Sequence, residues 1–280
     1  MTNSMNTNVQ YFIKNGDLVP INLFCNDLIE GHKIIYEVIR VIESTPIFLT
    51  DHINRLAQSI KLASLPPSNY DLIRTSIKQL LQKNPISQQN IKVVVCYKSE
   101  KDTPIFTAYF IPSKYPNQSE KINGIEVRTI RATRVNPEVK AENKSLRACA
   151  DEVIANTGCY EVLMINDSCN ITEGSRSNVF FVKNGKLITA PSSVVLGGIT
   201  RIKILEICSR QGIEVIPECI SISQISGIDG GFISGTSPGV LTISRIDNIK
   251  LNVNIDLIKQ INAEYETLIT NEIQSWKSNQ

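Results

Sequence analysis

Two Asn-Gly dipeptides, each set between apolar runs, constrain the fold of this chain more than any other local feature. Residues 11–19 and 179–189 place Asn-Gly, at 15–16 and 184–185, between segments rich in β-branched and aromatic residues. Both residue types tolerate the positive φ angles of a type I′ turn, which joins the two strands of a hairpin. We therefore expect one hairpin in each half of the chain, each opening a sheet.

Helix and strand patterns alternate along the rest of the chain. From Asp51 to Ala63 apolar residues recur every three or four positions, which predicts an amphipathic helix ending before Pro66 and Pro67. Similar patterns predict further helices at about 71–82, 143–156, 258–276 and directly after Gly198. Runs rich in β-branched and aromatic residues predict strands at 91–97, 104–111, 125–130, 161–165, 214–216 and 231–234.

The chain is long enough for two domains. It has 280 residues, which exceeds the usual size of one domain. The segment 112–120 is polar and contains two prolines, so it marks the boundary. We expect an N-terminal domain at 1–112, a linker at 113–122 and a C-terminal domain at 123–280. Alternating strands and helices with two hairpins predict a mixed fold, α+β or α/β.

Composition excludes several classes of protein. Lys and Arg number 29 against 27 Asp and Glu, so the basic surface of a nucleic-acid-binding protein is not expected. No apolar run approaches the ~20 residues that span a bilayer, and residues 1–10 lack the pattern of a signal peptide, which favours a cytoplasmic protein without a membrane partner. Seven scattered cysteines and two histidines predict reduced thiols and no metal site.

Spacing alone leaves the chemistry open. His32 and His52 are interpreted as surface or capping residues, which disfavours a Ser-His-Asp or Cys-His nucleophile. Residues 196–200 bring two glycines directly to a helix start, which suits a phosphate group but also occurs in ordinary loops. Lys140 is one of many lysines that could form a Schiff base with an aldehyde. Neither pattern selects a function by itself.

Five ordered motifs and two N-terminal signatures resemble those of the class IV aminotransferases. These fold-type IV pyridoxal-phosphate enzymes include branched-chain aminotransferase, D-amino-acid transaminase and aminodeoxychorismate lyase. The resemblance implies a smaller N-terminal α/β domain and a larger C-terminal mixed-sheet domain with pyridoxal 5'-phosphate between them. The N-terminal signatures are Tyr36-Glu-Val-Ile-Arg and His52-Ile-Asn-Arg-Leu. The motifs are Val139-Lys-Ala-Glu-Asn, Gly158-Cys-Tyr-Glu, Ile171-Thr-Glu-Gly-Ser-Arg-Ser-Asn, Gly198-Ile-Thr-Arg and Ser234-Gly-Thr-Ser-Pro-Gly.

The resemblance assigns the central groups of the site. Lys140 matches the lysine that forms the Schiff base, and Glu173 matches the carboxylate that faces the pyridine nitrogen. A carboxylate there keeps the nitrogen protonated, which makes the cofactor a better electron sink. Lys144 is the alternative candidate for the lysine that forms the Schiff base. Counting back from Glu161, the family interval of about 21 residues reaches Lys140, so Lys140 is preferred.

The resemblance also implies how the phosphate is bound. Arg55 matches the phosphate-binding arginine, a role suited to a permanently charged planar fork. Backbone groups of Ile199 and Thr200 match further phosphate contacts at a helix start. Thr236 matches a hydroxyl and amide donor that serves the phosphate or the substrate carboxylate.

Substrate recognition departs from the family pattern. Tyr36 falls where the family places an aromatic residue of the substrate pocket, and Ser237 follows the Gly-Thr motif. Lys92 stands about where branched-chain enzymes carry arginine, and Lys98 is either a substitute group for the substrate carboxylate or a solvated strand end. Lysine lacks the two-pronged geometry of arginine, and Pro238 removes a backbone donor, so neither known carboxylate scheme carries over intact.

Three enzyme hypotheses and one non-enzymatic hypothesis follow. The favoured hypothesis is transfer of an amino group between an apolar, branched-chain-like L-amino acid and a 2-oxo acid such as 2-oxoglutarate. The alternatives are an aminodeoxychorismate lyase that releases pyruvate to give 4-aminobenzoate, and a D-amino-acid transaminase. The non-enzymatic hypothesis is a cofactor-binding or scaffold protein that has kept the fold. The resemblance also implies a homodimer.

Overall fold

The computed structural model describes residues 9–100, 102–134 and 136–279. Residues group into two compact units, the first made of 1–114, 139–142 and 269–280 and the second of 115–138 and 143–268. We expected domains at 1–112 and 123–280 with a linker at 113–122. In the structure the boundary falls between residues 114 and 115, and segments 139–142 and 269–280 group with the first unit. Segment 139–142 groups with the first unit because its backbone pairs with residues 34–36 of that unit.

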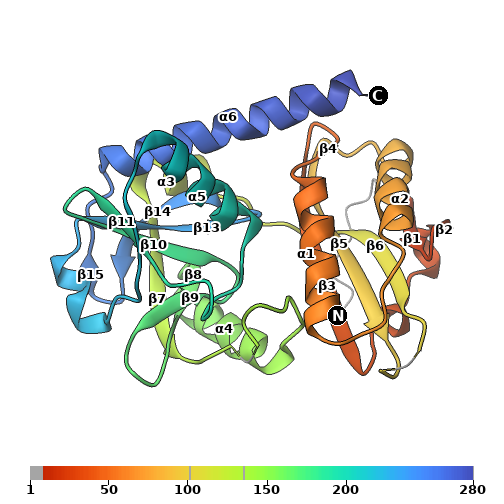
Figure 1. Cartoon of the computed structure of the whole chain (residues 1–280), viewed down its shortest axis with the longest axis horizontal. Coiled ribbons are helices and arrows are strands. Elements are labelled where there is room, and N and C mark those ends of the chain that lie inside the picture. Colours follow the sequence, from red (N-terminus) through yellow and green to blue (C-terminus); the bar gives the residue numbers. More distant parts are fainter. Residues whose placement is uncertain (1–8, 101, 135, 280) are drawn as a thin grey trace. The chain divides into compact units, whose positions relative to one another are not determined.

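The first unit is built on an antiparallel sheet of six strands in the order β2-β1-β6-β5-β3-β4. Its helices α1 and α2 are drawn in orange in Figure 1. The elements are β1 (Tyr11–Lys14), β2 (Asp17–Pro20), β3 (Lys33–Ile42), β4 (Thr45–Pro46), α1 (Leu49–Leu62), α2 (Tyr70–Lys83), β5 (Gln88–Tyr97) and β6 (Ile105–Ile111), with short 3-10 helices η1 (Ile21–Leu23) and η2 (Asn26–Leu28).

The first Asn-Gly hairpin is confirmed. Strands β1 and β2 pair antiparallel, with Lys14 opposite Asp17. Asn15 has a φ of 50° and Gly16 a φ of 101°, as a type I′ turn requires. A Cβ on Gly16 would lie 3.0 Å from the Leu72 side chain, so glycine also lets the turn approach α2 closely.

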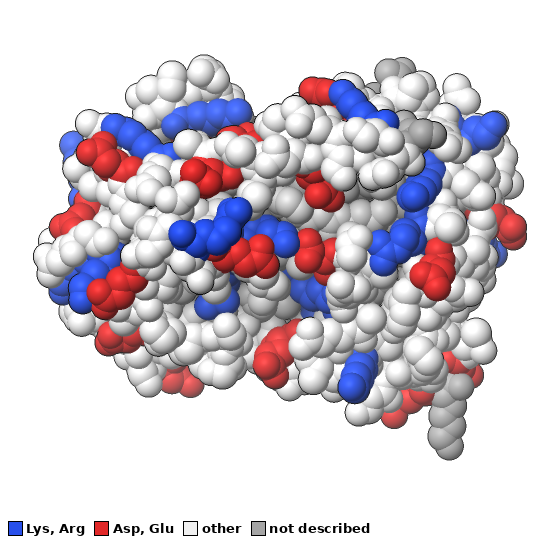
Figure 2. All heavy atoms as spheres, turned by 45° about the horizontal axis from the view of Figure 1, so that its top comes forward, with Lys and Arg blue, Asp and Glu red and all other residues white. Residues whose placement is uncertain are grey.

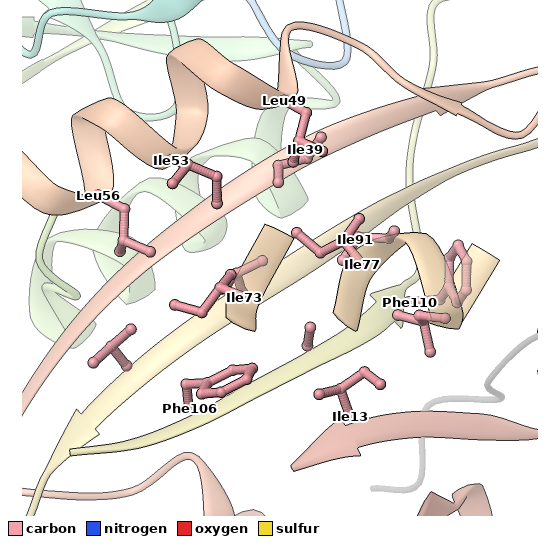
Figure 3. Close-up of a cluster of buried hydrophobic side chains, with 14 of the residues drawn as sticks. Ile13, Ile39, Leu49, Ile53, Leu56, Ile73, Ile77, Ile91, Phe106 and Phe110 are labelled. Atoms are coloured by element: carbon pink, nitrogen blue, oxygen red, sulfur yellow. The ribbon is translucent and has the colours of Figure 1, made fainter. Parts of the chain in front are cut away.

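One face of this sheet forms the main core of the first unit with helices α1 and α2. Alternate strand residues point to this face, and both helices contribute an apolar stripe. Figure 3 shows these side chains meeting between the helices and the strands. The labelled members are Ile13, Ile39, Leu49, Ile53, Leu56, Ile73, Ile77, Ile91, Phe106 and Phe110.

The opposite face of the same sheet carries a second, smaller cluster. Its buried members include Ile34, Tyr36, Val94 and Tyr109, and residues of the segment 21–29 pack against it. Successive residues of β3 therefore face different surroundings. Because of this alternation, the side chain of Glu37 points to the helix side and that of Tyr36 to the other side.

The second unit is built on a mixed sheet of nine strands. The strand order is β12-β11-β10-β13-β14-β7-β8-β9, with β15 on β14. Three pairs are parallel, namely β11 with β12, β7 with β14 and β7 with β8. The strands are β7 (Ile125–Arg131), β8 (Glu161–Ile165), β9 (Ile171–Gly174), β10 (Asn178–Lys183), β11 (Lys186–Thr189), β12 (Val215–Pro217), β13 (Gly230–Gly235), β14 (Gly239–Ile246) and β15 (Ile249–Lys250).

Helices cover this sheet, and its second hairpin is also confirmed. Strands β10 and β11 pair antiparallel around Asn184 (φ 52°) and Gly185 (φ 71°). Figure 1 shows α5 above the strands β10 and β13 and α4 below β8 and β9. The helices are α3 (Gln118–Asn123), α4 (Lys144–Thr157), α5 (Ile199–Gln211), the 3-10 helix η3 (Ile222–Gly227) and α6 (Asp256–Ser278), whose last residues group with the first unit.

Helix α3 begins inside the segment 113–122, which was expected to link the two domains. The side chain of Asn117 accepts from the Glu120 backbone N–H at 2.9 Å, and Glu120 accepts from the Asn117 N–H at 2.7 Å. This reciprocal capping box satisfies two donors at the helix start. In this polar, proline-containing segment, the Asn-x-x-Glu pattern is the local sequence signal for the helix start.

Candidate active site

Segment 139–142, which carries Lys140, is held against strand β3 by backbone hydrogen bonds. The Tyr36 N–H donates to the Lys140 carbonyl at 3.2 Å, and the Glu142 N–H donates to the Ile34 carbonyl at 3.2 Å. Ala141 forms a bridge with Ile35 between these bonds. Side chains alternate along an extended segment, so those of Lys140 and Glu142 lie on the sheet face that carries Tyr36.

Two ammonium groups lie close to the Tyr36 ring. The Lys140 Nζ is 4.8 Å from the ring centroid, and the Lys92 Nζ is 5.0 Å from it. Lys92 also forms an ion pair with Glu142, with 3.3 Å between Nζ and Oε1. A cation near an aromatic face is stabilised by the electron-rich ring. The structure thus brings together the predicted residues Lys140 and Tyr36.

Arg55 is fixed by a carboxylate on the helix side of the sheet. Its Nε donates to Glu37 Oε1 at 2.7 Å and its Nη2 donates to Glu37 Oε2 at 2.6 Å. Such two-pronged pairing is the strongest geometry for a guanidinium and a carboxylate. His52 Nδ1 contacts the same Oε2 at 2.7 Å. His52 is only 3% exposed, which corrects its interpretation as a surface or capping residue.

The pKa values of Glu37 and His52 are both lower than their ordinary values. Burial raises the pKa of Glu37, but the charge and hydrogen bonds of Arg55, with the contact from His52, outweigh burial and lower the pKa to about 2. Burial lowers the pKa of His52, and the contact with Glu37 opposes that shift. The positive charges of Arg55 and Lys140 lower the His52 pKa further. Glu37 is therefore ionised at neutral pH, and its charge neutralises Arg55.

Replacing Glu37 by glutamine is expected to make the free energy of unfolding less dependent on pH in the acid range. A pKa lowered from 4.5 to about 2 means that the carboxylate stabilises the folded state above pH 4.5 and loses that contribution as the pH falls toward 2. The effect is roughly 3 kcal/mol. Urea unfolding of wild type and Glu37→Gln between about pH 7 and pH 3 should show a stability difference that shrinks with acid.

The matched control is Glu100→Gln, which removes a carboxylate whose side chain is 71% exposed. That substitution should leave both stability and its pH dependence close to wild type. A difference between wild type and Glu37→Gln that is the same at both ends of the pH range would contradict the assigned ionisation of Glu37.

Lys98 lies at the end of β5, and its ammonium is engaged with backbone. It donates to the carbonyl oxygens of Asp27 and Glu30, at 3.1 Å for Asp27. The residue is exposed. These bonds tie η2 and the residues just after it to the strand end. A substrate carboxylate would therefore compete with two carbonyl acceptors for the Lys98 ammonium.

In the second unit, Glu173 is a buried carboxylate with three donors. It ends strand β9 with 2% exposure, and Arg134 Nε donates to its Oε1 at 2.7 Å. The Leu196 N–H and the Asn178 Nδ2 donate to its Oε2 at 3.1 and 3.4 Å. Arg134 compensates the charge of the carboxylate. The carboxylate is therefore fixed in both position and orientation.

Asn178 links Glu173 to the start of helix α5. Besides the bond to Glu173, its Nδ2 donates to the Leu196 carbonyl at 2.9 Å. A Cβ at Gly198 would lie 2.2 Å from the Asn178 Oδ1, so only glycine fits at the position that precedes the helix. Predicted residues Glu173, Ile199 and Thr200 are thus brought into one neighbourhood of the second unit.

The start of α5 fits an anionic group such as a phosphate. The first N–H groups of a helix lack partners within the helix and carry a partial positive charge. Gly198 provides no side-chain cap, and no acidic residue lies in the first turn. Arg201, 3% exposed, adds a buried positive charge, and its Nε has no hydrogen-bond partner among the described residues.

Thr236 and Ser237 lie in the turn between β13 and β14. Strand β13 pairs with β10 so that Ser234 lies opposite Asn178. The turn therefore follows the strand end that neighbours Asn178 and, through it, Glu173. This places the Gly-Thr motif in the same part of the second unit as the α5 start.

Glu161 supports the loop that follows Glu173. This buried carboxylate accepts from the Ser175 and Ser177 hydroxyls at 2.7 and 2.9 Å and from the N–H groups of Val162 and Arg176 at 2.8 and 3.2 Å. Four donors satisfy a charge that has no cation partner in the ion pairs of the described residues. Its role is therefore to fix the loop between β9 and β10.

Sequence reasoning missed four of the groups that fix this site: Glu37, Arg134, Glu161 and Asn178. Each partner lies far away in the sequence or depends on a local turn, as with Arg134 and Glu173, which are 39 residues apart. The signal that could have found Glu37 and Asn178 was their place inside motifs already noted. For Arg134 the sequence offers no periodicity or spacing signal.

On the face shown in Figure 2, basic and acidic side chains are interspersed. The seven cysteines are free thiols. Within the described ranges, no cluster of three or more His, Cys, Asp or Glu side chains is arranged to hold a metal ion. Nor does any helix in that part of the chain have the length and hydropathy needed to cross a bilayer.

Two curated relatives resemble the chain over most of its length. A provisionally named branched-chain-amino-acid aminotransferase of Methanocaldococcus jannaschii is 27% identical over 246 residues, which are 83% of this chain and 84% of that protein. The D-alanine aminotransferase of Bacillus licheniformis is 26% identical over 224 residues, which are 76% of this chain and 78% of that protein. The names of the relatives thus include both a branched-chain-amino-acid aminotransferase and a D-alanine aminotransferase.

Solved structures share the fold. The branched-chain amino acid aminotransferase of Thermobaculum terrenum in its PLP form superposes with a TM-score of 0.81 at 22% identity, covering 95% of this chain and 96% of that one. A provisionally named 4-amino-4-deoxychorismate lyase of Legionella pneumophila gives 0.73 at 22% identity, covering 84% and 91%. Residues 34–246 match the family model described as Amino-transferase class IV, and the chain therefore belongs to the class IV aminotransferases.

Proposed function

We propose that this chain transfers an amino group between an apolar, branched-chain-like L-amino acid and a 2-oxo acid such as 2-oxoglutarate, using pyridoxal 5'-phosphate. The observation that carries the proposal is the placement of Lys140, pinned by backbone bonds beside the Tyr36 ring. When bound, the cofactor supplies an aldehyde that condenses with amines and a ring that accepts electrons from the α-carbon.

Lys140 is assigned the covalent and proton-transfer roles. Its Nζ would hold the cofactor covalently at the aldehyde carbon. As a neutral amine, the same Nζ would act as the base that takes the proton from the substrate α-carbon. Backbone pairing of segment 139–142 with β3 limits the positions that this amine can take.

Glu173 and Arg55 are assigned to the two ends of the cofactor. The Glu173 carboxylate, fixed by Arg134, Leu196 and Asn178, would keep the pyridine nitrogen protonated. Arg55 and the N–H groups of Ile199 and Thr200 would hold the phosphate. The uncapped α5 start supports this assignment.

Substrate contacts are assigned to three further residues. Tyr36 would line the pocket for the substrate side chain, and Thr236 and Ser237 would donate to the substrate carboxylate or the phosphate. For Lys98, whose ammonium is already held by two carbonyls, a carboxylate-binding role requires release of those bonds. A homodimer and a cytoplasmic location, which the sequence led us to expect, remain part of this proposal.

A half-reaction panel tests the proposed substrates. Purified enzyme loaded with pyridoxal phosphate is mixed with single L- and D-amino acids, and loss of the absorbance band of the lysine-bound cofactor is followed. L-Leucine and related apolar L-amino acids should convert the band, and 2-oxoglutarate should restore it. Reaction with D-amino acids alone would refute the proposed stereochemistry, and pyruvate release from aminodeoxychorismate without conversion by L-leucine would favour the lyase.

A further inference from the structure

His52 is a buried histidine that has no role in the proposed mechanism. It lies on α1 and is 3% exposed, three residues before Arg55. Residues three apart on a helix share a face, and both side chains reach Glu37 on β3. The other histidine, His32, has a side chain that is 57% exposed and lies 3.7 Å from Glu100. The two histidines of the chain therefore have opposite environments.

The hydrogen bond between His52 and Glu37 has a defined direction. Glu37 is ionised at neutral pH, and an ionised carboxylate only accepts hydrogen bonds. The His52 Nδ1, 2.7 Å from Glu37 Oε2, must therefore carry the hydrogen. With the Nε and Nη2 of Arg55, three donors surround the two oxygens of a carboxylate that has no exposed surface.

Glu37 in turn sets the plane of the Arg55 guanidinium. Arg55 presents one edge, Nε and Nη2, to the two carboxylate oxygens at 2.7 and 2.6 Å. A guanidinium is flat and rigid, so this pairing directs Nη1 away from Glu37. A phosphate that binds Arg55 therefore meets an orientation that Glu37 fixes, and Glu37 is itself held by His52.

The same helix also holds the segment that carries Lys140. Ser59, a buried residue of α1, accepts a hydrogen bond from the Lys140 N–H at 3.3 Å. A general displacement of α1 would therefore disturb both the lysine that binds the cofactor aldehyde and the arginine that binds the phosphate. Loss of the His52 hydrogen bond alone acts on Arg55. This difference separates a positioning role of His52 from a merely structural one.

We propose that His52 is a positioning residue for the cofactor phosphate, which acts through Glu37 on Arg55. Its neutral ring gives the buried Glu37 oxygen a donor without adding a positive charge, so both oxygens stay aligned with Arg55. Without His52 that oxygen loses a partner, and the carboxylate turns from the paired geometry toward another donor. The inference rests on the proposed function, in which Arg55 binds the phosphate.

Comparing pyridoxal 5'-phosphate with pyridoxal isolates the phosphate contribution. Pyridoxal has the same ring and aldehyde but no phosphate, so the ratio of the two Kd values reports phosphate binding. In absorbance titrations of the cofactor-free chain, His52→Leu should raise the Kd of pyridoxal 5'-phosphate by about tenfold. The Kd of pyridoxal should change by less than about twofold.

Two amide variants test whether the donor at Nδ1 is the group that matters. His52→Asn places an amide nitrogen at the position of Nδ1 and should keep both Kd values close to wild type. The amide nitrogen of His52→Gln lies one bond further from the main chain. His52→Gln should therefore behave like His52→Leu, and it provides the same test if the leucine variant does not fold.

The remaining variants provide the controls. His32→Leu alters the exposed histidine and should leave the ratio of Kd values unchanged. Arg55→Met should raise the Kd of pyridoxal 5'-phosphate by about a hundredfold. Adding His52→Leu to Arg55→Met should not change the ratio further, because His52 acts on the phosphate only through Arg55.

An unchanged Kd of pyridoxal 5'-phosphate in His52→Leu, or an equal rise of both Kd values, would overturn the positioning role. A full effect of His52→Leu in the Arg55→Met background would overturn it as well. These outcomes differ from failure of the proposed function. If no amino acid converts the absorbance band in the half-reaction panel, the proposed function fails, whereas the Kd ratios still report whether His52 acts on the phosphate.

Discussion

Replacing Lys140 by alanine is expected to abolish transamination and to remove the absorbance band of the lysine-bound cofactor. Alanine provides neither the amine that holds the cofactor nor the base that moves the α-proton, and loss of a positioned general base alone costs about 10²–10⁴ in rate. We expect a decrease in kcat of more than about a thousandfold. Rapid-mixing absorbance with L-leucine and steady-state assays measure the two effects.

The rival lysine provides the control for this prediction. Lys144 is the first residue of α4, four positions after Lys140, and is exposed. Lys144→Ala should retain both the absorbance band and a kcat close to wild type. Persistence of the band in Lys140→Ala together with its loss in Lys144→Ala would transfer the catalytic role to Lys144.

Replacing Glu173 by glutamine is expected to have the second-largest effect. An amide does not keep the pyridine nitrogen protonated, so electrons from the α-carbon are accepted less readily. We expect kcat to fall by roughly 10²–10³, the loss typical when one fixed electrostatic group is removed. Glutamine has nearly the same shape as glutamate, so it can still accept the bond from Arg134 Nε, which is now 2.7 Å long.

The ¹⁵N chemical shift of the cofactor ring nitrogen distinguishes loss of its protonation from a general disturbance of the protein structure. In wild type loaded with ¹⁵N-labelled cofactor, the ring nitrogen should have the chemical shift of a protonated pyridine, and in Glu173→Gln that of an unprotonated one. Glu126→Gln, which alters an exposed pair with Arg245, should change neither the shift nor kcat. A protonated nitrogen in Glu173→Gln would refute the assigned role of Glu173.

Local chemistry made much of the fold predictable. The two Asn-Gly hairpins were predicted because the required positive φ angles restrict the residue types that fit. Helix α1 was predicted from Asp51 and observed at Leu49–Leu62, since its apolar spacing reflects the face that meets the sheet. Strand β14 was missed, because the turn residues before it obscured the alternation in Gly239–Ile246.

The candidate site was less predictable, because tertiary pairing creates it. Lys140 was selected through family resemblance, whereas the pairing of its segment with β3 became visible only in the structure. His52 was misinterpreted because its burial depends on Glu37, which reaches it across the contact between α1 and β3. No sequence pattern predicts that a histidine on a helix will meet a carboxylate on a strand.

The central claim, that Lys140 carries the cofactor, is tested most directly by reducing the loaded enzyme with borohydride and mapping the modified peptide after trypsin digestion. A modified lysine resists trypsin. Attachment at Lys140 should therefore give the peptide 135–144 with the phosphopyridoxyl group on its internal lysine. A modified peptide 141–147, with the group on Lys144, or modification at any other lysine would contradict the account.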